Sequence, residues 1–249
     1  MKANAATNEC RRGFLKAAGA AAVTFALSGL SMAVRAATTT IGKMKIGIVG
    51  SGRVGGTVGG VWVKAGHEVM FSSLDLEADK KLAASLGPNA RAGTPREAAA
   101  FGDVLLISVP YSALPAVGRD LGDLIKGKVV IDTCNPIVAR DGEMATAARE
   151  KGAGLASAEF LPGARIVRAF NAIGYSRMGE AARQTERMGM PMAGDDANAL
   201  AVASGLVREI GYEPVIIGPL AMGKHLIPGS PLSGERAPAE IRQIAATLK

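Results

Sequence analysis

Short apolar runs and amphipathic stretches alternate along the chain from residue 44 onward. Met44–Val49 is a β-branched run that ends at a glycine, which is typical of a buried parallel strand. The same pattern predicts further strands at 68–72, 104–109, 129–133, 165–170, 190–193 and 214–217, and helices at 53–65, 75–86, 95–101, 112–125 and 196–210. Strands that alternate with helices predict an α/β fold with a doubly wound parallel sheet.

A glycine motif follows the first predicted strand and opens the first predicted helix. It reads G-x-G-x-x-G and consists of Gly50, Ser51, Gly52, Arg53, Val54 and Gly55. In this context the first glycine permits a tight turn, the second lets the backbone approach a pyrophosphate, and the third allows close packing of helix on strand. The N–H groups at the start of the helix then hold the phosphates. The motif therefore predicts dinucleotide binding by residues 50–55.

The end of the second predicted strand bears on the choice between NADP and NAD. Asp75 stands twenty residues after the last glycine of the motif, the spacing of an acid that binds a ribose 2′-OH. Counting from the preceding turn, however, places the strand tip at Ser72 or Ser73 and Asp75 in the loop beyond. Two hydroxyls suit a 2′-phosphate, and Lys80 and Lys81 are near enough to add positive charge. NADP is favoured over NAD, and Asp75 is the residue that argues for NAD.

The composition describes a globular protein with a modest charge. The 249 residues are 48% hydrophobic and 20% charged, which suits a sizeable core, and aromatic residues at 4% disfavour a stacking platform for single-stranded nucleic acid. Residues 1–36 hold five of the 29 Lys and Arg residues and one of the 22 Asp and Glu residues, so without them the net charge falls from +7 to +3. We therefore expect no nucleic-acid partner.

The first 36 residues read as an export signal. Arg11 and Arg12 precede Phe-Leu-Lys and the apolar stretch 17–33, and Ala36 closes a small-residue cleavage site. The pair of arginines resembles the twin-arginine signature, although Cys10 stands where Ser or Thr is usual. The stretch is short for a membrane anchor and is diluted by polar and glycine residues. We expect a periplasmic or otherwise exported protein that does not stay in the membrane after cleavage.

Six short motifs follow one another along the rest of the chain. In order they are GSGRVGGT with AGHEVMFSS, FGDVLLISVP, DTCNP, ARIVRAFNAIG, MAGDD and IIGPL. Together they resemble the NADPH-dependent reductases that use the deazaflavin coenzyme F420. The resemblance implies a Rossmann domain with a small C-terminal extension of the sheet, and direct hydride transfer between two bound cofactors. At one position the chain departs, because Leu74 stands where the family commonly has an arginine that contacts the 2′-phosphate.

The resemblance, together with the positions of the strand ends, implies further site residues. Ligands lie outside the carboxyl ends of parallel strands. Val109, Pro110 and Asn135 are therefore expected to contact the ribose and nicotinamide, and residues 169–172, which include Asn171, to line the cleft of a second cofactor, F420 or a flavin. Each could instead be a strand terminator or a core residue. The resemblance also suggests a homodimer.

These observations divide the chain into four parts. They are a signal peptide (1–36), a linker (37–43), a dinucleotide-binding domain (44–163), and a C-terminal sheet extension with the second-substrate region (164–249).

Several other residues have plainer interpretations. Cys134 at a strand end is expected to be a small buried hydrophobe, and His67 a turn residue that faces solvent. The acidic pair 195–196 reads as a helix cap. Tyr175 has Gly179 four residues later, so the Tyr-x-x-x-Lys dyad of short-chain dehydrogenases is absent from the sequence. No spaced cluster of metal ligands stands out either.

We therefore predict a site without a catalytic side chain, in which the protein brings two flat rings together and excludes water. Two alternatives remain open from the sequence. One is a reductase of a different acceptor, such as a flavin, a quinone or an imine, on the same nucleotide domain. The other is an exported NADP-binding protein without enzymatic activity.

Overall fold

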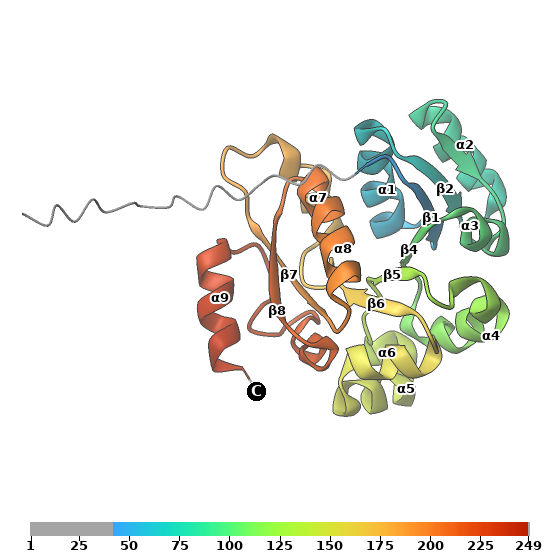
Figure 1. The fold of residues 1–249 in the computed structure, drawn as a ribbon. Helices are drawn as coiled ribbons and strands as arrows, with labels where there is room; N and C mark the ends of the chain where they lie inside the picture. Colours follow the sequence, from blue (N-terminus) through green and yellow to red (C-terminus); the bar gives the residue numbers. More distant parts are fainter. Residues whose placement is uncertain (1–41, 249) are drawn as a thin grey trace, which may run out of the picture. The chain divides into compact units, whose positions relative to one another are not determined.

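The computed structural model describes residues 42–248, and the predicted signal peptide and most of the predicted linker lie outside the described residues. Within this part of the chain an eight-stranded sheet has the order β3-β2-β1-β4-β5-β6-β7-β8 (Figure 1). The strands are β1 (Lys45–Val49), β2 (Glu68–Ser72), β3 (Ala90–Ala92), β4 (Val104–Ile107), β5 (Val129–Asp132), β6 (Arg165–Arg168), β7 (Gly189–Gly194) and β8 (Glu213–Gly218). One sheet thus runs through both the predicted dinucleotide-binding part (44–163) and the predicted C-terminal part (164–249).

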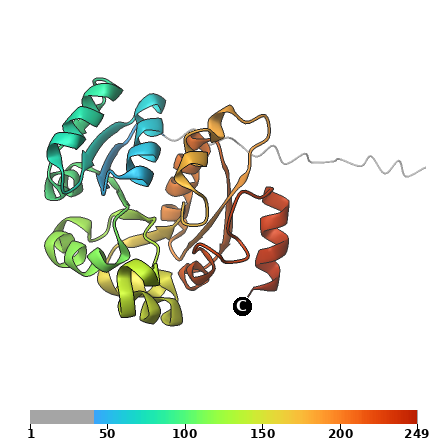
Figure 2. The same cartoon turned by 180° about the vertical axis from the view of Figure 1, so that it is seen from behind.

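Helices cover both faces of this sheet. They are α1 (Arg53–Ala65), α2 (Leu76–Leu86), α3 (Pro95–Phe101), α4 (Leu114–Ile125), α5 (Val138–Lys151), α6 (Ala153–Phe160), α7 (Tyr175–Met178), α8 (Ala197–Ile210) and α9 (Pro238–Thr247), with short 3-10 turns η1 (Tyr111–Ala113), η2 (Ala181–Arg183) and η3 (Leu220–His225). One core cluster packs α1, α2 and α8 against one face of the sheet. A second cluster packs α3, α4, α5 and α6 against the other face. Figure 2 shows α4, α5 and α6 side by side, coloured green to yellow.

The alternation of side chains along β1 and β4 creates the two cores. Ile46, Ile48 and Leu106 belong to the cluster under α1 and α8, whereas Leu105 and Ile107 belong to the opposite cluster. Successive side chains of a strand point to opposite faces, and both faces here are covered, so β4 is apolar throughout and β1 is buried after its first residue, Lys45. The sequence prediction of a buried parallel sheet is confirmed for β1 to β6.

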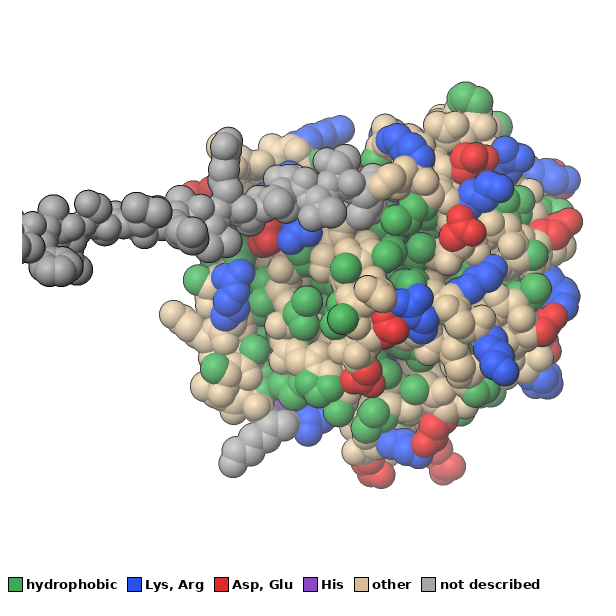
Figure 3. All heavy atoms as spheres, viewed as in Figure 1, with side chains coloured by type: hydrophobic (Ala, Val, Ile, Leu, Met, Phe, Trp, Pro, Cys, Tyr) green, Lys and Arg blue, Asp and Glu red, His purple; other side chains and the backbone are tan. Residues whose placement is uncertain are grey.

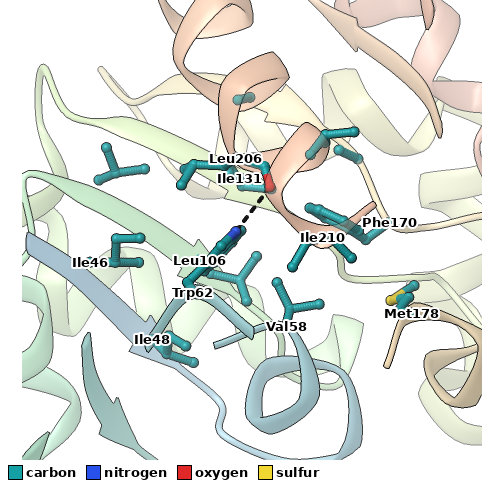
Figure 4. Close-up of a cluster of buried hydrophobic side chains, with 14 of the residues drawn as sticks. Ile46, Ile48, Val58, Trp62, Leu106, Ile131, Phe170, Met178, Leu206 and Ile210 are labelled. Atoms are coloured by element: carbon teal, nitrogen blue, oxygen red, sulfur yellow. Dashed lines mark hydrogen bonds between the residues drawn. The ribbon is translucent and has the colours of Figure 1, made fainter. Parts of the chain in front are cut away.

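Trp62 fastens α1 to α8 across the first core. Its side chain is fully buried, and its indole N–H donates to the carbonyl oxygen of Leu206 over 3.0 Å (Figure 4). The ring of Phe170 meets it edge-on, with centroids 6.2 Å apart. Phe170, which the resemblance placed at a cofactor cleft, is therefore a core residue, because its ring packs on Trp62 under the sheet.

The last two strands depart from the predicted parallel arrangement. β7 pairs with β6 in the antiparallel sense, and β8 is parallel to β7. A parallel connection needs a long crossover, usually a helix. Between β6 and β7 the chain forms only the four-residue helix α7 and the turn η2. The unit β7-α8-β8 consequently extends the sheet in the reverse direction.

His67 is a second correction. The sequence suggested a solvent-facing turn residue, but the side chain is fully buried at the start of β2. Its Nδ1 accepts the N–H of Met44 at 3.0 Å, and its Nε2 lies 2.6 Å from a carboxylate oxygen of Glu209 on α8. The imidazole is therefore a polar link inside the fold. The turn between α1 and β2 is made by Gly66, the C-cap of α1, which has a φ of 94°.

The surface charges are mixed. On the face shown in Figure 3, basic and acidic side chains are interspersed over α2, α3 and α4. Ion pairs such as Arg96 with Asp123 and Lys80 with Glu77 account for part of this pattern. This face therefore carries no extended basic stripe of the kind that binds a nucleic-acid backbone.

Candidate active site

The predicted motif residues lie where the strand order reverses. β1 has β2 on one side and β4 on the other, so the chain winds outward in both directions from this point. In an open parallel sheet, this switch point leaves a crevice at the carboxyl ends of the strands. The glycine motif follows β1, and residues 108–110 follow β4. The sequence thus places both at the ligand-binding edge of the sheet.

Gly50 and Gly55 are required by close backbone contacts. Gly50 has a φ of 100°, and a Cβ there would lie 2.2 Å from the carbonyl oxygen of Ser108. A Cβ on Gly55 would lie 2.1 Å from the carbonyl oxygen of Gly50. A side chain at either position would push apart β1, β4 and α1, which these contacts hold together.

Gly52 has the opposite surroundings. It is the N-cap of α1, and a Cβ built on it would meet no atom within 4 Å. No side chain caps this end, and the first turn of α1 has no acidic residue. The unpaired N–H groups and the positive end of the helix dipole therefore face open space. Such a surface suits the pyrophosphate of a dinucleotide, so the residues present fit this part of the cofactor.

Ser72, the last residue of β2, forms hydrogen bonds that hold the glycine loop in place. Its carbonyl oxygen accepts the N–H groups of Gly50 and Ser51, at 2.8 and 2.9 Å. Its hydroxyl donates to the carbonyl oxygen of Ile48 at 2.6 Å, and the residue is fully buried. We predicted Ser72 as a phosphate contact, but its hydroxyl points into the sheet. The position holds the glycine turn on β2.

Asp79 is a site residue that sequence reasoning missed. It lies in the first turn of α2, and only 2% of its surface is exposed. One carboxylate oxygen accepts the hydroxyl of Ser51, and the other accepts the hydroxyl of Ser73 at 2.9 Å. Asp79 therefore ties the glycine loop to the tip of β2. Asp79 stands four residues after Asp75, and no sequence motif marks this position as part of a binding site.

Two adjoining clefts open along this edge. The larger, of about 560 Å³, runs from Gly50 and Gly52 to the β2 tip at Ser73, Leu74 and Asp75. The smaller, of about 290 Å³, lies between α1 and the segment after β5. Residues 108–110 line both clefts, so Val109 and Pro110 lie between them, as a contact to the middle of an extended ligand requires.

The smaller cleft contains the polar residue predicted at the end of β5. Its wall includes Arg53, Thr133, Asn135, Ile137 and Arg140. The amide N–H of Asn135 donates to the carbonyl oxygen of Asn171 at 2.9 Å, which joins the ends of β5 and β6. Asn171 itself is 4% exposed and does not line either cleft. The structure therefore brings Asn135 to the cleft and places Asn171 behind it.

A buried ion pair supports Asn135. The guanidinium of Arg168 on β6 lies 2.6 Å from the carboxylate of Asp132 on β5, and both side chains are fully buried. Arg168 also donates to the carbonyl oxygens of Cys134 and Leu226, at 3.1 and 3.2 Å. These bonds fix the strand ends beneath the cleft. Cys134 is buried, as predicted, and burial raises the pKa of its thiol well above the ordinary value.

Asp141 braces the two loops that form the smaller cleft. It accepts the hydroxyl of Ser112, after β4, at 3.0 Å and the N–H of Ile137, after β5, at 3.0 Å. Arg140 donates to both of its oxygens. Burial alone would raise the pKa of Asp141, but the hydrogen bonds from Arg140, Ile137 and Ser112 outweigh it and lower the pKa to about 2. Asp141 is thus an ionised hub inside the cleft wall.

The smaller cleft has no carboxylate, histidine, cysteine or lysine among its described lining residues. The larger cleft has two carboxylates, Asp75 and Asp120, but no histidine, cysteine, glutamate or lysine among its described lining residues. Within residues 42–248 no group of His, Cys, Asp or Glu side chains is arranged to hold a metal ion. No helix in that range is both long and apolar enough to cross a membrane.

Comparison with known proteins agrees with this geometry. Residues 45–136 match the family described as "NADP oxidoreductase coenzyme F420-dependent". Over 180 residues the chain is 30% identical to the F420-dependent NADP reductase of Methanothermobacter thermautotrophicus, which covers 67% of this chain and 77% of that protein.

Two solved structures share the fold. A hypothetical protein of Sinorhizobium meliloti superposes with a TM-score of 0.64 at 22% identity, over 77% of this chain and 93% of that one. A candidate F420-dependent NADP reductase from Arthrobacter sp. FB24 superposes with a TM-score of 0.57 at 20% identity, over 73% and 87%. The chain belongs to the family of F420-dependent NADP oxidoreductases, and it is an NADP-dependent oxidoreductase with a Rossmann-type sheet.

Proposed function

We propose that this protein transfers hydride between NADP(H) and the deazaflavin coenzyme F420. The observation that carries the proposal is the smaller cleft. It adjoins the dinucleotide edge, and its charged lining residues are two arginines, Arg53 and Arg140. F420 combines a flat ring with an anionic side chain, so a cleft with basic walls beside the nicotinamide end suits it. Ile137, which lines this cleft and is 40% exposed, offers apolar surface for the ring.

The protein's own part in the reaction is positioning. When bound, NADPH supplies a hydride, the deazaflavin ring accepts it, and water supplies the accompanying proton. The N-terminus of α1 would hold the pyrophosphate, Val109 and Pro110 would support the middle of the dinucleotide, and Asn135 would orient its nicotinamide half. Since the described walls of the smaller cleft hold no carboxylate, histidine, cysteine or lysine, the rate depends on orientation and on exclusion of water.

The test is anaerobic turnover of purified protein with NADPH and F420, followed through both chromophores. Arg53→Gln should raise the KM for F420 by about tenfold, because it removes one cation from the smaller cleft. Lys64→Gln is the matched control, since it removes one charge from the far end of the same helix. Turnover of a flavin or quinone in place of F420 would contradict the proposal, and equal effects of the two substitutions would contradict the role of the cleft.

We also propose that residues 1–36 direct export by the twin-arginine route to the periplasm. The proposal rests on Arg11 and Arg12 and on the apolar stretch that follows, all outside the described residues. Replacing both arginines with lysine should leave the protein inside the cytoplasm, as measured by cell fractionation of a tagged full chain. Unchanged fractionation of the doubly substituted chain would argue against this route.

A further inference from the structure

The larger cleft ends at the tip of β2, where the adenosine ribose of a dinucleotide lies in this fold. A 2′-phosphate there carries close to two negative charges and is normally bound by arginine or lysine. At this tip Leu74 is fully exposed to solvent and lines the cleft. Leucine offers neither charge nor a hydrogen-bond donor.

The charged residues of the larger cleft have the wrong sign for a phosphate. In the part of the chain that the structure describes, they are Asp75 and Asp120. Asp75 is fixed in place, because its carboxylate accepts the N–H of Ala78 at 3.0 Å and caps α2. Lys80 and Lys81, which the sequence suggested as phosphate partners, do not line the cleft, and Lys80 pairs with Glu77 at 2.8 Å.

The serine hydroxyls at the tip of β2 already form hydrogen bonds within the protein. Ser73 donates to the buried carboxylate of Asp79, and its oxygen accepts the N–H of Asp75 at 3.1 Å. The hydroxyl of Ser72 is turned into the sheet. A 2′-phosphate would therefore meet the carboxylate of Asp75 and no cation among the described lining residues, whereas a ribose 2′-OH could donate to the free oxygen of Asp75.

We propose that this chain does not discriminate against NADH, and that it binds NADH at least as well as NADPH. The inference rests on the proposed dinucleotide-dependent function and concerns its specificity. The pyrophosphate and nicotinamide parts of the site are common to both cofactors. The 2′-phosphate gains no partner that would offset its desolvation and its repulsion by Asp75.

The direct test compares the binding of 5′-AMP and 2′,5′-ADP to the full mature protein by calorimetry, without any acceptor. The wild-type protein should bind 5′-AMP at least as tightly as 2′,5′-ADP. Leu74→Arg should tighten 2′,5′-ADP by about tenfold or more and leave 5′-AMP nearly unchanged. Leu74→Gln, equally long and polar but uncharged, is the matched control and should not change the ratio.

Asp75→Asn separates charge from structure, because asparagine is an equally good helix cap. It should shift the affinity ratio toward 2′,5′-ADP while the melting temperature stays the same. A wild-type preference for 2′,5′-ADP of about 100-fold or more would overturn the inference but leave the proposed function standing. Failure of both nucleotides to bind a folded protein would overturn the function and the inference together. Turnover with NADPH and F420 alongside equal nucleotide affinities supports both.

Discussion

Arg168 and Asp132 are direct neighbours on adjacent parallel strands, and their fully buried side chains form an ion pair with an N–O distance of 2.6 Å. The pair lies at the end of β5. Arg168 also donates hydrogen bonds to the side-chain oxygen of Asn135 and to the carbonyl oxygen of Leu226. It therefore joins the dinucleotide half of the sheet to the C-terminal extension at the cleft.

Breaking this pair should destabilise the fold strongly. Arg168→Met leaves the Asp132 carboxylate buried without its partner, and we expect unfolding in urea to require about 3 to 5 kcal/mol less free energy. Arg96→Met removes one member of the exposed pair with Asp123 and should cost far less, because solvent screens that pair. Similar losses for the two variants would show that burial of the first pair is unimportant.

The glycine motif offers a second contrast. Gly52→Val should fold normally, because its Cβ has open space, but it should weaken dinucleotide binding about 100-fold by filling the pyrophosphate position. Gly50→Ala should instead lose more than about 2 kcal/mol of stability, from its positive φ and the contact with Ser108. Thermal melts and nucleotide titrations of both variants distinguish the two effects. If Gly52→Val bound the dinucleotide as tightly as wild type, the N-terminus of α1 would not be part of the binding site.

Local signals made part of this architecture predictable. The glycine spacing marked the β1–α1 turn, and the helix predicted at 95–101 is α3, which begins with a capping box between Thr94 and Glu97. Asp196 caps α8 as expected, accepting the N–H of Ala199. Each of these features depends on residues within one turn of each other, so periodicity and capping rules identify them.

Other features escaped prediction for physical reasons. α5 contains Gly142 with a non-helical backbone, so its apolar positions follow no steady helical period. β3 has only three residues. Asp79, Asp141 and Arg168 act through partners on other elements, and the sequence does not reveal which strand ends meet. His67 was misjudged because its partner Glu209 lies 142 residues away.

Asp141 predicts a pH dependence. Its folded pKa of about 2 lies below the ordinary carboxyl value, so its contribution to stability is fully present above about pH 4 and is lost between about pH 4 and 2. Asp141→Asn should therefore lower stability by about 1 to 2 kcal/mol at neutral pH, and the difference from wild type should shrink toward pH 2. Glu143→Gln, on the exposed side of α5, is the control. If the stability difference between this variant and wild type were as large at pH 2 as at neutral pH, Asp141 would not act as an ionised carboxylate.

The buried histidine gives a prediction for the far end of the sheet. His67→Phe leaves the N–H of Met44 and the carboxylate of Glu209 without their partner, and we expect a loss of about 2 kcal/mol in unfolding free energy. Glu209→Gln retains a hydrogen-bond acceptor for the ring and should cost less. Nucleotide affinity should not change in either variant, because neither residue lines a cleft. Equal stability of His67→Phe and wild type in chemical denaturation would contradict the structural role of this side chain.

The central claim is direct hydride transfer from one bound cofactor to the other, with the protein acting by position alone. The most direct measurement uses NADPH deuterated at the transferable C4 position, one stereoisomer at a time, with F420 in ordinary water and mass spectrometry of the reduced coenzyme. The account predicts that one stereoisomer passes its deuterium to F420 and that the other passes none. Reduced F420 without deuterium from either stereoisomer, or no reduction by a protein that binds NADPH, would contradict it.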